Sequence, residues 1–492
     1  MKKIKYTIVV LALIITSNSC NTNDLELTNP NELLPETFFK TEAQVQSSVN
    51  AAYANLQTFS LYGRLLFYMM DNMSQEAAGN PQEELEKKTY RDFSFDSSNV
   101  QILDFYTSCF LGITKANFVI ANSEKIYAIS DSDLPLVTKN KFIAEARFLR
   151  AYYYFLLANR FGGVPVWETL PDGPIGKARG TKEEVYDLII KDLQFASENL
   201  LDKSKEQKGR ATKGAALAFL GKAYLYQKKY TEALTAFNKI SGYSLESNFY
   251  NNFTEENEHG VESLLEVEYD RNLGTGNKWD SPTSGQGLNE ATFRGQDYGN
   301  LNWFNTYPSN DLLDEYEAGD KRFAGSFYVV GDTYNNGNNT MTVDNFKASG
   351  NTRRAAWKKY QNYYKQTDEQ QESGINFKII RWADVLLMKA ECENEVGSRA
   401  TAINYINEVR TRSGLAGVPS TAIKADVFQA IVHERKVELA GEQVRFDDIL
   451  RWGISDTALK GTNFIKGKSE LWPIPDKVYS TNPNIGAQNP GY

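Results

Sequence analysis

The sequence predicts a mostly α-helical fold, in which tetratricopeptide-like pairs of helices form a scaffold and a loop-rich, partly β insertion forms the ligand side. Three observations support this prediction. Apolar residues recur every three to four positions over long stretches in both halves of the chain. Residues 211–240 have the spacing of a two-helix repeat unit. Residues 242–375 are instead rich in Gly, Asn and aromatic residues and show few helical stripes.

The first 19 residues have the pattern of a bacterial signal peptide. Three lysines precede an apolar run from Thr7 to Ile15, which is shorter than the ~20 residues that a membrane-spanning helix needs. Ser19 then precedes Cys20, as in lipoprotein signals, where the cysteine becomes the lipidated first residue. We therefore predict that Cys20 carries a lipid anchor. Cleavage of an ordinary secretory signal near Ser19 is the alternative.

Four helices are predicted before residue 200, each from a capping residue or an apolar face. The first begins after Thr41 and continues to about Leu56, and the second is capped by Asn99 and continues to about Glu124. The third covers residues 138–160. The fourth begins with the capping box Thr181–Glu184 and ends near Leu200. Gly162 and Gly163 follow the third helix and predict its end.

Residues 211–240 contain the clearest repeat signal. The small residues Gly221 and Ala233 stand where two helices of a repeat approach closely, and Phe237 stands where a larger side chain fills the seam. Residues 378–410 show the same pattern more weakly. Since one such unit cannot bury its own apolar face, we expect several helix pairs to stack.

The segment 242–375 is predicted to be an insertion between helical blocks. Leu264 to Tyr269 is a strand candidate, and residues 327–334 and 340–346 are predicted to form a hairpin around Asn336-Gly337. We divide the chain accordingly into a signal peptide (1–19), an N-terminal helical region (20–241), the insertion (242–375) and a C-terminal helical region (376–492).

Residue types needed for common enzyme sites are scarce. His259 and His433 are the only histidines, so a histidine-based metal enzyme is hard to build. No nucleophile elbow occurs, and a phosphate loop ending at Lys468 fails because residue 462 is Thr. A net charge of −8 argues against nucleic-acid binding. We predict no cofactor, no metal and no catalysis, although 62 acidic residues leave a carboxylate-pair glycosidase as an alternative.

Residues 433–452 carry acidic and basic side chains at helical neighbour spacings, which predicts a salt-bridge network between helices rather than an active site. Cys109 and Cys392 lie in apolar helical segments and are predicted to be buried thiols. A disulfide between them is the alternative in an exported protein.

Several motifs occur in order along nearly the whole chain. They are the signal ending in Cys20, the runs 144–154 and 161–166, the pair 213–216 and 221–225, the runs 381–391 and 407–415, the charged stretch 434–452, and the end motifs 472–475 and 488–492. Together they resemble the SusD/RagB family of outer-membrane nutrient-uptake lipoproteins.

The resemblance implies a non-catalytic, lipid-anchored protein of the cell outer membrane, exposed at the surface. Such a protein sits as a lid on a SusC-like TonB-dependent barrel transporter and delivers captured oligosaccharide, or in some members peptide, to the barrel. Two readings from other classes stay open: a membrane-anchored glycoside hydrolase and a protein–protein scaffold built on the repeats.

The ligand site is predicted to be an aromatic platform with polar partners, placed from sequence position alone. In the insertion we assign it to Trp279, Tyr298, Asn302 and Trp303, with a second contribution from a loop around Asp71, Asn72 and Tyr90. We expect packing roles for the other tryptophans, Trp167, Trp382, Trp452 and Trp472, and an exposed rim position for Trp357 beside basic residues.

Overall fold

A computed structural model describes residues 38–80, 83–170, 176–273, 290–347 and 353–492. Cys20 and Trp279 lie outside these residues. The helices are α2 (Glu42–Ala54), α3 (Leu65–Met73), α4 (Leu85–Arg91), α5 (Val100–Ala121), α6 (Ser123–Ala128), α7 (Leu136–Phe161), α8 (Lys182–Asn199), α9 (Lys213–Tyr226), α10 (Tyr230–Phe237), α11 (Arg294–Tyr298), α12 (Asn310–Glu315), α13 (Lys321–Ser326), α14 (Trp382–Val396), α15 (Arg399–Arg412), α16 (Lys424–Glu438), α17 (Arg445–Trp452), α18 (Ser455–Ala458) and α19 (Asp476–Thr481). The strands are β1 (Ala77–Gly79), β2 (Ser263–Val267), β3 (Thr306–Pro308), β4 (Phe327–Val329), β5 (Thr333–Tyr334), β6 (Asn339–Thr340), β7 (Ala355–Trp357) and β8 (Phe377–Arg381).

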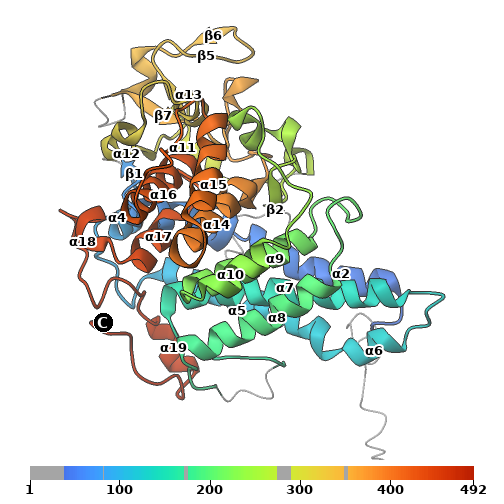
Figure 1. Ribbon diagram of the computed structural model, residues 1–492. Helices are drawn as coiled ribbons and strands as arrows, with labels where there is room; N and C mark the ends of the chain where they lie inside the picture. The colour runs from blue at the N-terminus through green and yellow to red at the C-terminus, as the bar shows by residue number, and fades with distance from the viewer. Residues whose placement is uncertain (1–37, 81–82, 171–175, 274–289, 348–352) are drawn as a thin grey trace, which may run out of the picture.

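Consecutive helices pack side by side into what we call the helical stack. It consists of α5, α7, α8, α9 and α10, followed by α14, α15 and α16. In Figure 1 the helices α7 to α10 lie next to one another in the lower half, while the hairpin β5–β6 lies at the top. The mostly α-helical prediction is confirmed, and each helix of the stack buries its apolar face against its neighbours.

The predicted capping residues begin the helices as expected. The side chain of Thr41 accepts a hydrogen bond from the backbone N–H of Gln44, and that of Asn99 accepts one from Ile102. Thr181 and Glu184 form the reciprocal capping box at the start of α8. Gly162 ends α7 with a φ of 70°, which a residue with a Cβ rarely adopts.

Helices α9 and α10 form the predicted repeat unit. A Cβ atom added to Gly221 would overlap the ring of Phe237, so this contact tolerates only glycine in the present arrangement. Ala233 on α10 is fully buried. The prediction that Gly221 lies at a helix–helix contact is confirmed.

The insertion contains short antiparallel pairings rather than one sheet. The hairpin around Asn336-Gly337 is present, with Thr333 opposite Thr340. Its predicted length was wrong, because β4 pairs with the distant β7 and residues Val343–Phe346 form a 3₁₀ helix. The predicted strand near Leu264 is β2, which pairs with β8 at the start of the C-terminal helices.

A buried ion-pair network joins the insertion to the C-terminal helices. The guanidinium of Arg381, at the end of β8, contacts Glu262, Glu438 and Glu442. Arg322 from α13 contacts Glu434 and Glu438 of α16. The predicted interhelix network is therefore confirmed, and besides Arg381 and Arg322 it includes Arg410 and Arg412 of α15, which contact Glu434 and Glu438.

Cys109 and Cys392 are free and buried in the described structure, and burial raises the pKa of both thiols. Within the described residues, none of the helices combines the length and the apolar composition that crossing a membrane requires.

Candidate functional site

Trp303 is the one exposed tryptophan among the six that the structure describes, with 39% of its surface accessible. It lies in the turn between α11 and β3, in the insertion. Trp357 and Trp472 are buried, and Trp167, Trp382 and Trp452 are half-buried. The expected rim position of Trp357 was wrong, because its ring packs between Phe327 and Tyr298.

The ring of Trp303 rests on an arginine that the core holds in place. The guanidinium carbon of Arg64 lies 5.5 Å from the Trp303 ring centroid. Its Nε and Nη2 atoms donate to the two carboxylate oxygens of Asp297 at 2.8 and 2.9 Å. The rings of Phe59 and Phe293 lie 5.5 and 5.3 Å from the same guanidinium. This bidentate and stacked arrangement fixes the plane on which Trp303 rests.

The charges beneath the ring are matched in pairs. Burial would raise the pKa of Asp297, but the charge and hydrogen bonds of Arg64 and the charge of Lys87 together outweigh it, and the pKa falls below its usual value. Glu84 accepts from Arg64 at 3.1 Å and from Lys87 at 2.9 Å, and these cations outweigh partial burial and lower the pKa of Glu84 as well. The base of the Trp303 platform is therefore close to neutral.

Asn302 gives the platform a polar edge. Its Nδ2 donates to Asp368 Oδ1, and its Oδ1 accepts from the Tyr363 hydroxyl and, at 3.3 Å, from the backbone N–H of Glu369. Asn302 is half-buried and Asp368 is exposed. The structure thus places the half-buried Asn302 directly beside the exposed Trp303.

Four other predicted ligand residues do not face solvent: Tyr298, Asp71, Asn72 and Tyr90, all fully buried. This corrects their placement on a surface loop, since Asp71 and Asn72 lie on α3 and Tyr90 on α4. The Tyr298 hydroxyl donates to Asp71 Oδ2 at 2.7 Å, and burial raises the pKa of both groups. Tyr298 and Asp71 therefore form core beneath the platform rather than ligand surface in this structure.

Sequence reasoning missed Arg64 and Asp368, which complete the site. Arg64 lies 233 positions before its partner Asp297, so no local pattern connects them. Asp368 lies 66 positions after Asn302. Its one local signal is the polar turn 366–371, since Asp side chains favour such turns by bonding to the backbone two residues on.

Two clusters of histidine and carboxylates come close to metal-binding spacing: His259 with Glu266 and Glu268, and His433 with Glu317 and Glu434. Protein cations already occupy both. Lys378 lies 3.1 Å from Glu266, and Arg410 bonds to Glu317 and Glu434. These clusters are better described as ion-pair groups than as metal sites.

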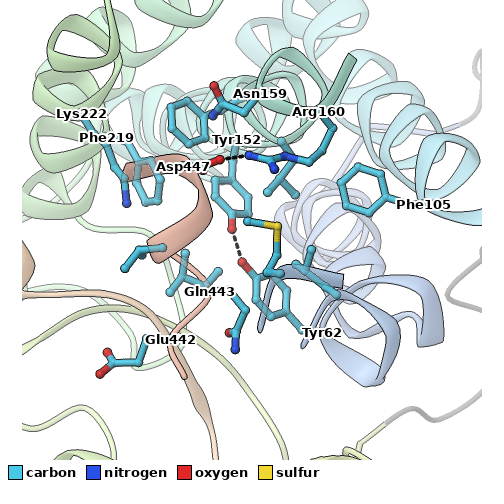
Figure 2. A pocket seen from close by; sticks show the side chains of 16 residues that line it. Tyr62, Phe105, Tyr152, Asn159, Arg160, Phe219, Lys222, Glu442, Gln443 and Asp447 are labelled. Atoms are coloured by element: carbon cyan, nitrogen blue, oxygen red, sulfur yellow. Dashed lines mark hydrogen bonds and ion pairs between the residues drawn. The ribbon is translucent and has the colours of Figure 1, made fainter. Parts of the chain in front are cut away.

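An interior pocket lies between the helical stack and the loop before α17 (Figure 2). The ion pair of Arg160 with Asp447 and the hydroxyl pair Tyr62–Tyr152 line it. Its volume is about 50 Å³, which accommodates a few water molecules. An oligosaccharide does not fit there.

A larger groove of about 410 Å³ lies on the helical stack, between α5 and α19. Phe110, Pro165, Trp167 and Val478 are among the residues that line it. Trp167 is half-buried, with the Lys177 ammonium 5.2 Å from its ring centroid. This groove is an alternative aromatic surface, so it serves as a comparison for Trp303.

Comparison with known families identifies the chain. A family model described as the SusD family matches residues 238–492, slightly more than half of the chain. The chain belongs to the SusD family. A second model, described as "Starch-binding associating with outer membrane", matches residues 24–225. SusD membership confirms the resemblance seen in the sequence, and the second description supports association with the outer membrane and a carbohydrate ligand.

Individual relatives agree over the full length. The SusD-like protein P2 of Formosa agariphila is 29% identical over 520 residues, which cover 100% of both chains. Among solved structures, a SusD superfamily protein from Bacteroides vulgatus is 26% identical with a TM-score of 0.79, over 93% of this chain and 100% of that chain. A laminarin-binding SusD-like protein is also 26% identical, with a TM-score of 0.78, over 92% of this chain and 100% of its own. A binding protein among the relatives fits the prediction of a non-enzymatic SusD-family chain.

Proposed function

We propose that this protein is a surface-exposed, lipid-anchored glycan-binding protein that captures oligosaccharide and delivers it to a SusC-like TonB-dependent barrel transporter. The observation that carries the proposal is the exposed Trp303 ring on its Arg64–Asp297 support, edged by Asn302. The laminarin-binding relative supports carbohydrate as the ligand class.

The platform suits a sugar ring chemically. A pyranose has apolar C–H faces that pack on an aromatic ring and hydroxyl edges that need hydrogen-bond partners. Trp303 supplies the aromatic ring for the C–H face. The amide of Asn302 and the carboxylate of Asp368 supply hydrogen-bond partners for the hydroxyls. Because Arg64 already holds the Trp303 ring, little conformational entropy is lost on binding.

The charges around Trp303 favour binding over hydrolysis. A glycosidase needs a carboxylic acid with a raised pKa beside a second carboxylate. Asp297, Glu84 and Asp368 all have lowered pKa values. Burial raises the pKa of Glu369 to about 8, but its side chain is buried against the backbone N–H of Asn362 and does not face a ligand.

In this proposal residues 242–375 supply most of the ligand side, and the helical stack faces the barrel. Trp279, in the same segment, is proposed as a further aromatic contact. The lipid on Cys20 holds the chain at the outer membrane. Replacement of Cys20 by Ala should release the protein from the membrane fraction, and membrane association that survives alkaline washing would contradict the anchor.

The test of the ligand site is Trp303→Ala, measured by calorimetry against a panel of glycans and peptides. Loss of one aromatic anchor should weaken glycan binding by about 2 kcal/mol, roughly thirtyfold. Trp167→Ala is the matched control, because it removes an aromatic side chain from the groove on the helical stack.

Unchanged affinity of the Trp303→Ala variant, with loss in Trp167→Ala, would move the site to the helical stack. Binding of peptides alone would favour a peptide-capturing protein. Release of reducing ends from any glycan in the panel would contradict the non-enzymatic assignment.

A further inference from the structure

We infer that Asp368 makes the Trp303 site selective for neutral glycans over anionic ones such as uronate-containing or sulfated polysaccharides. This inference rests on the proposed function and names the substrate class of the same site. It concerns a residue whose only local sequence signal was the polar turn around it.

Asp368 retains a full negative charge beside the platform. Its carboxylate accepts from Asn302 Nδ2, from the backbone N–H of Gln370 at 3.1 Å and from Gln370 Nε2 at 2.9 Å. All three donors are neutral. The hydrogen bond from Asn302 is the main reason that the pKa of Asp368 lies below its usual value, so the side chain is ionised at neutral pH.

The other carboxylates in these contacts do not add a comparable charge. Asp297 and Glu84 are matched by the buried cations Arg64 and Lys87. Glu369 is buried with its pKa raised to about 8, so it is largely uncharged at neutral pH. Among the described residues that take part in these contacts, Asp368 is therefore the ionised carboxylate whose hydrogen-bond partners are all neutral.

This single charge has opposite effects on two kinds of sugar. A carboxylate has about four lone-pair positions, and the three bonds to Asn302 and Gln370 leave room for a sugar hydroxyl. A sulfate or carboxylate on the sugar would instead meet a like charge, and because Asp368 is exposed, water and salt weaken this repulsion. One such repulsion reduces affinity by about threefold to tenfold at moderate salt.

The experiment compares each neutral polysaccharide with its own carboxymethylated derivative. Laminarin, starch, xylan and galactomannan are tested in both forms by affinity electrophoresis, at low and at high salt. The wild type should prefer the neutral form of the polysaccharide that it binds best. Asp368→Asn keeps the shape and one acceptor oxygen, and it should narrow this preference by about threefold to tenfold. High salt should also reduce the preference of the wild type for the neutral form, because salt screens the repulsion between Asp368 and the carboxymethyl groups.

Asp456→Asn is the matched control, because it removes one exposed carboxylate from α18 and changes net charge equally. It should leave the preference unchanged. A preference in Asp368→Asn within about twofold of wild type would overturn the inference, as would a wild type that prefers the carboxymethylated form. If Trp303→Ala loses neutral-glycan binding while Asp368→Asn changes nothing, only the charge selectivity fails. If Trp303→Ala has no effect, the proposed site itself fails.

Discussion

The helical stack and the insertion (residues 242–375) are stabilised by contacts of different range. In the stack, Gly221 meets Phe237 on the next helix of the same repeat unit, 16 positions later. In the insertion, Trp303 rests on Arg64, whose partner Asp297 is 233 positions away. The stack therefore depends on repeated local packing, whereas the platform depends on a few long-range polar contacts. A single substitution should be absorbed more easily in the first than in the second.

The largest expected effect is on the long-range side of this comparison. Arg381→Ala should lower the free energy of unfolding by about 3–5 kcal/mol, because it removes the cation that contacts all three of the buried carboxylates Glu262, Glu438 and Glu442. Arg412, Arg322 and Lys359 each keep a contact with only one or two of these carboxylates. Denaturant unfolding followed by circular dichroism measures the loss. Lys424→Ala removes an exposed ion pair with Glu395 and should change stability by less than about 1 kcal/mol. Equal losses in the two variants would contradict the difference between the regions.

A smaller effect is expected within the stack. Gly221→Leu should cost about 1–3 kcal/mol, because the new side chain overlaps Phe237. Combining it with Phe237→Ala tests the contact directly, since the truncated ring makes room for the leucine. The double variant should lose less stability than the sum of the single variants. A Gly221→Leu protein with an unchanged melting temperature would refute the close helix–helix contact.

The smallest expected effect is a pH dependence in the insertion. Burial of the His259 ring would lower its pKa, but the hydrogen bond with Glu268 at 3.1 Å and the charge of Glu266 raise it above its ordinary 6.5. A raised folded pKa stabilises the protein fully at pH values below 6.5, and this contribution is lost as pH rises through the folded pKa.

The melting temperature of wild type and of His259→Gln should therefore differ more in acid than in mildly alkaline buffer, by about 1–2 °C. His433 has its own carboxylate partners and is unchanged in both proteins, so it cancels from the comparison. If the difference in melting temperature between the two proteins grew as the pH rises, the stabilising ion pairs of His259 with Glu268 and Glu266 would be excluded.

The sequence predicted the short-range contacts of the fold but not the long-range ones. Caps such as Asn99 and Thr181, and the Gly221 contact, were predictable because their partners lie three to sixteen positions away. The burial of Tyr298 was not, since it depends on Asp71, 227 positions earlier. For Trp303 the sequence indicated a candidate ring but could not show that Arg64 supports it. The predicted hairpin of residues 327–334 and 340–346 was too long for the same reason. A hairpin signal reports only neighbouring strands, so it could not show that β4 pairs with the distant β7.

The two buried thiols give the protein a practical property. Cys109 and Cys392 have raised pKa values and no accessible surface, so maleimide reagents should leave both unmodified in the folded state. In a version that begins after Cys20, a single cysteine introduced beside Trp303 would then be the one reactive position. A fluorophore attached there would report ligand arrival in real time, without prior removal of the native cysteines.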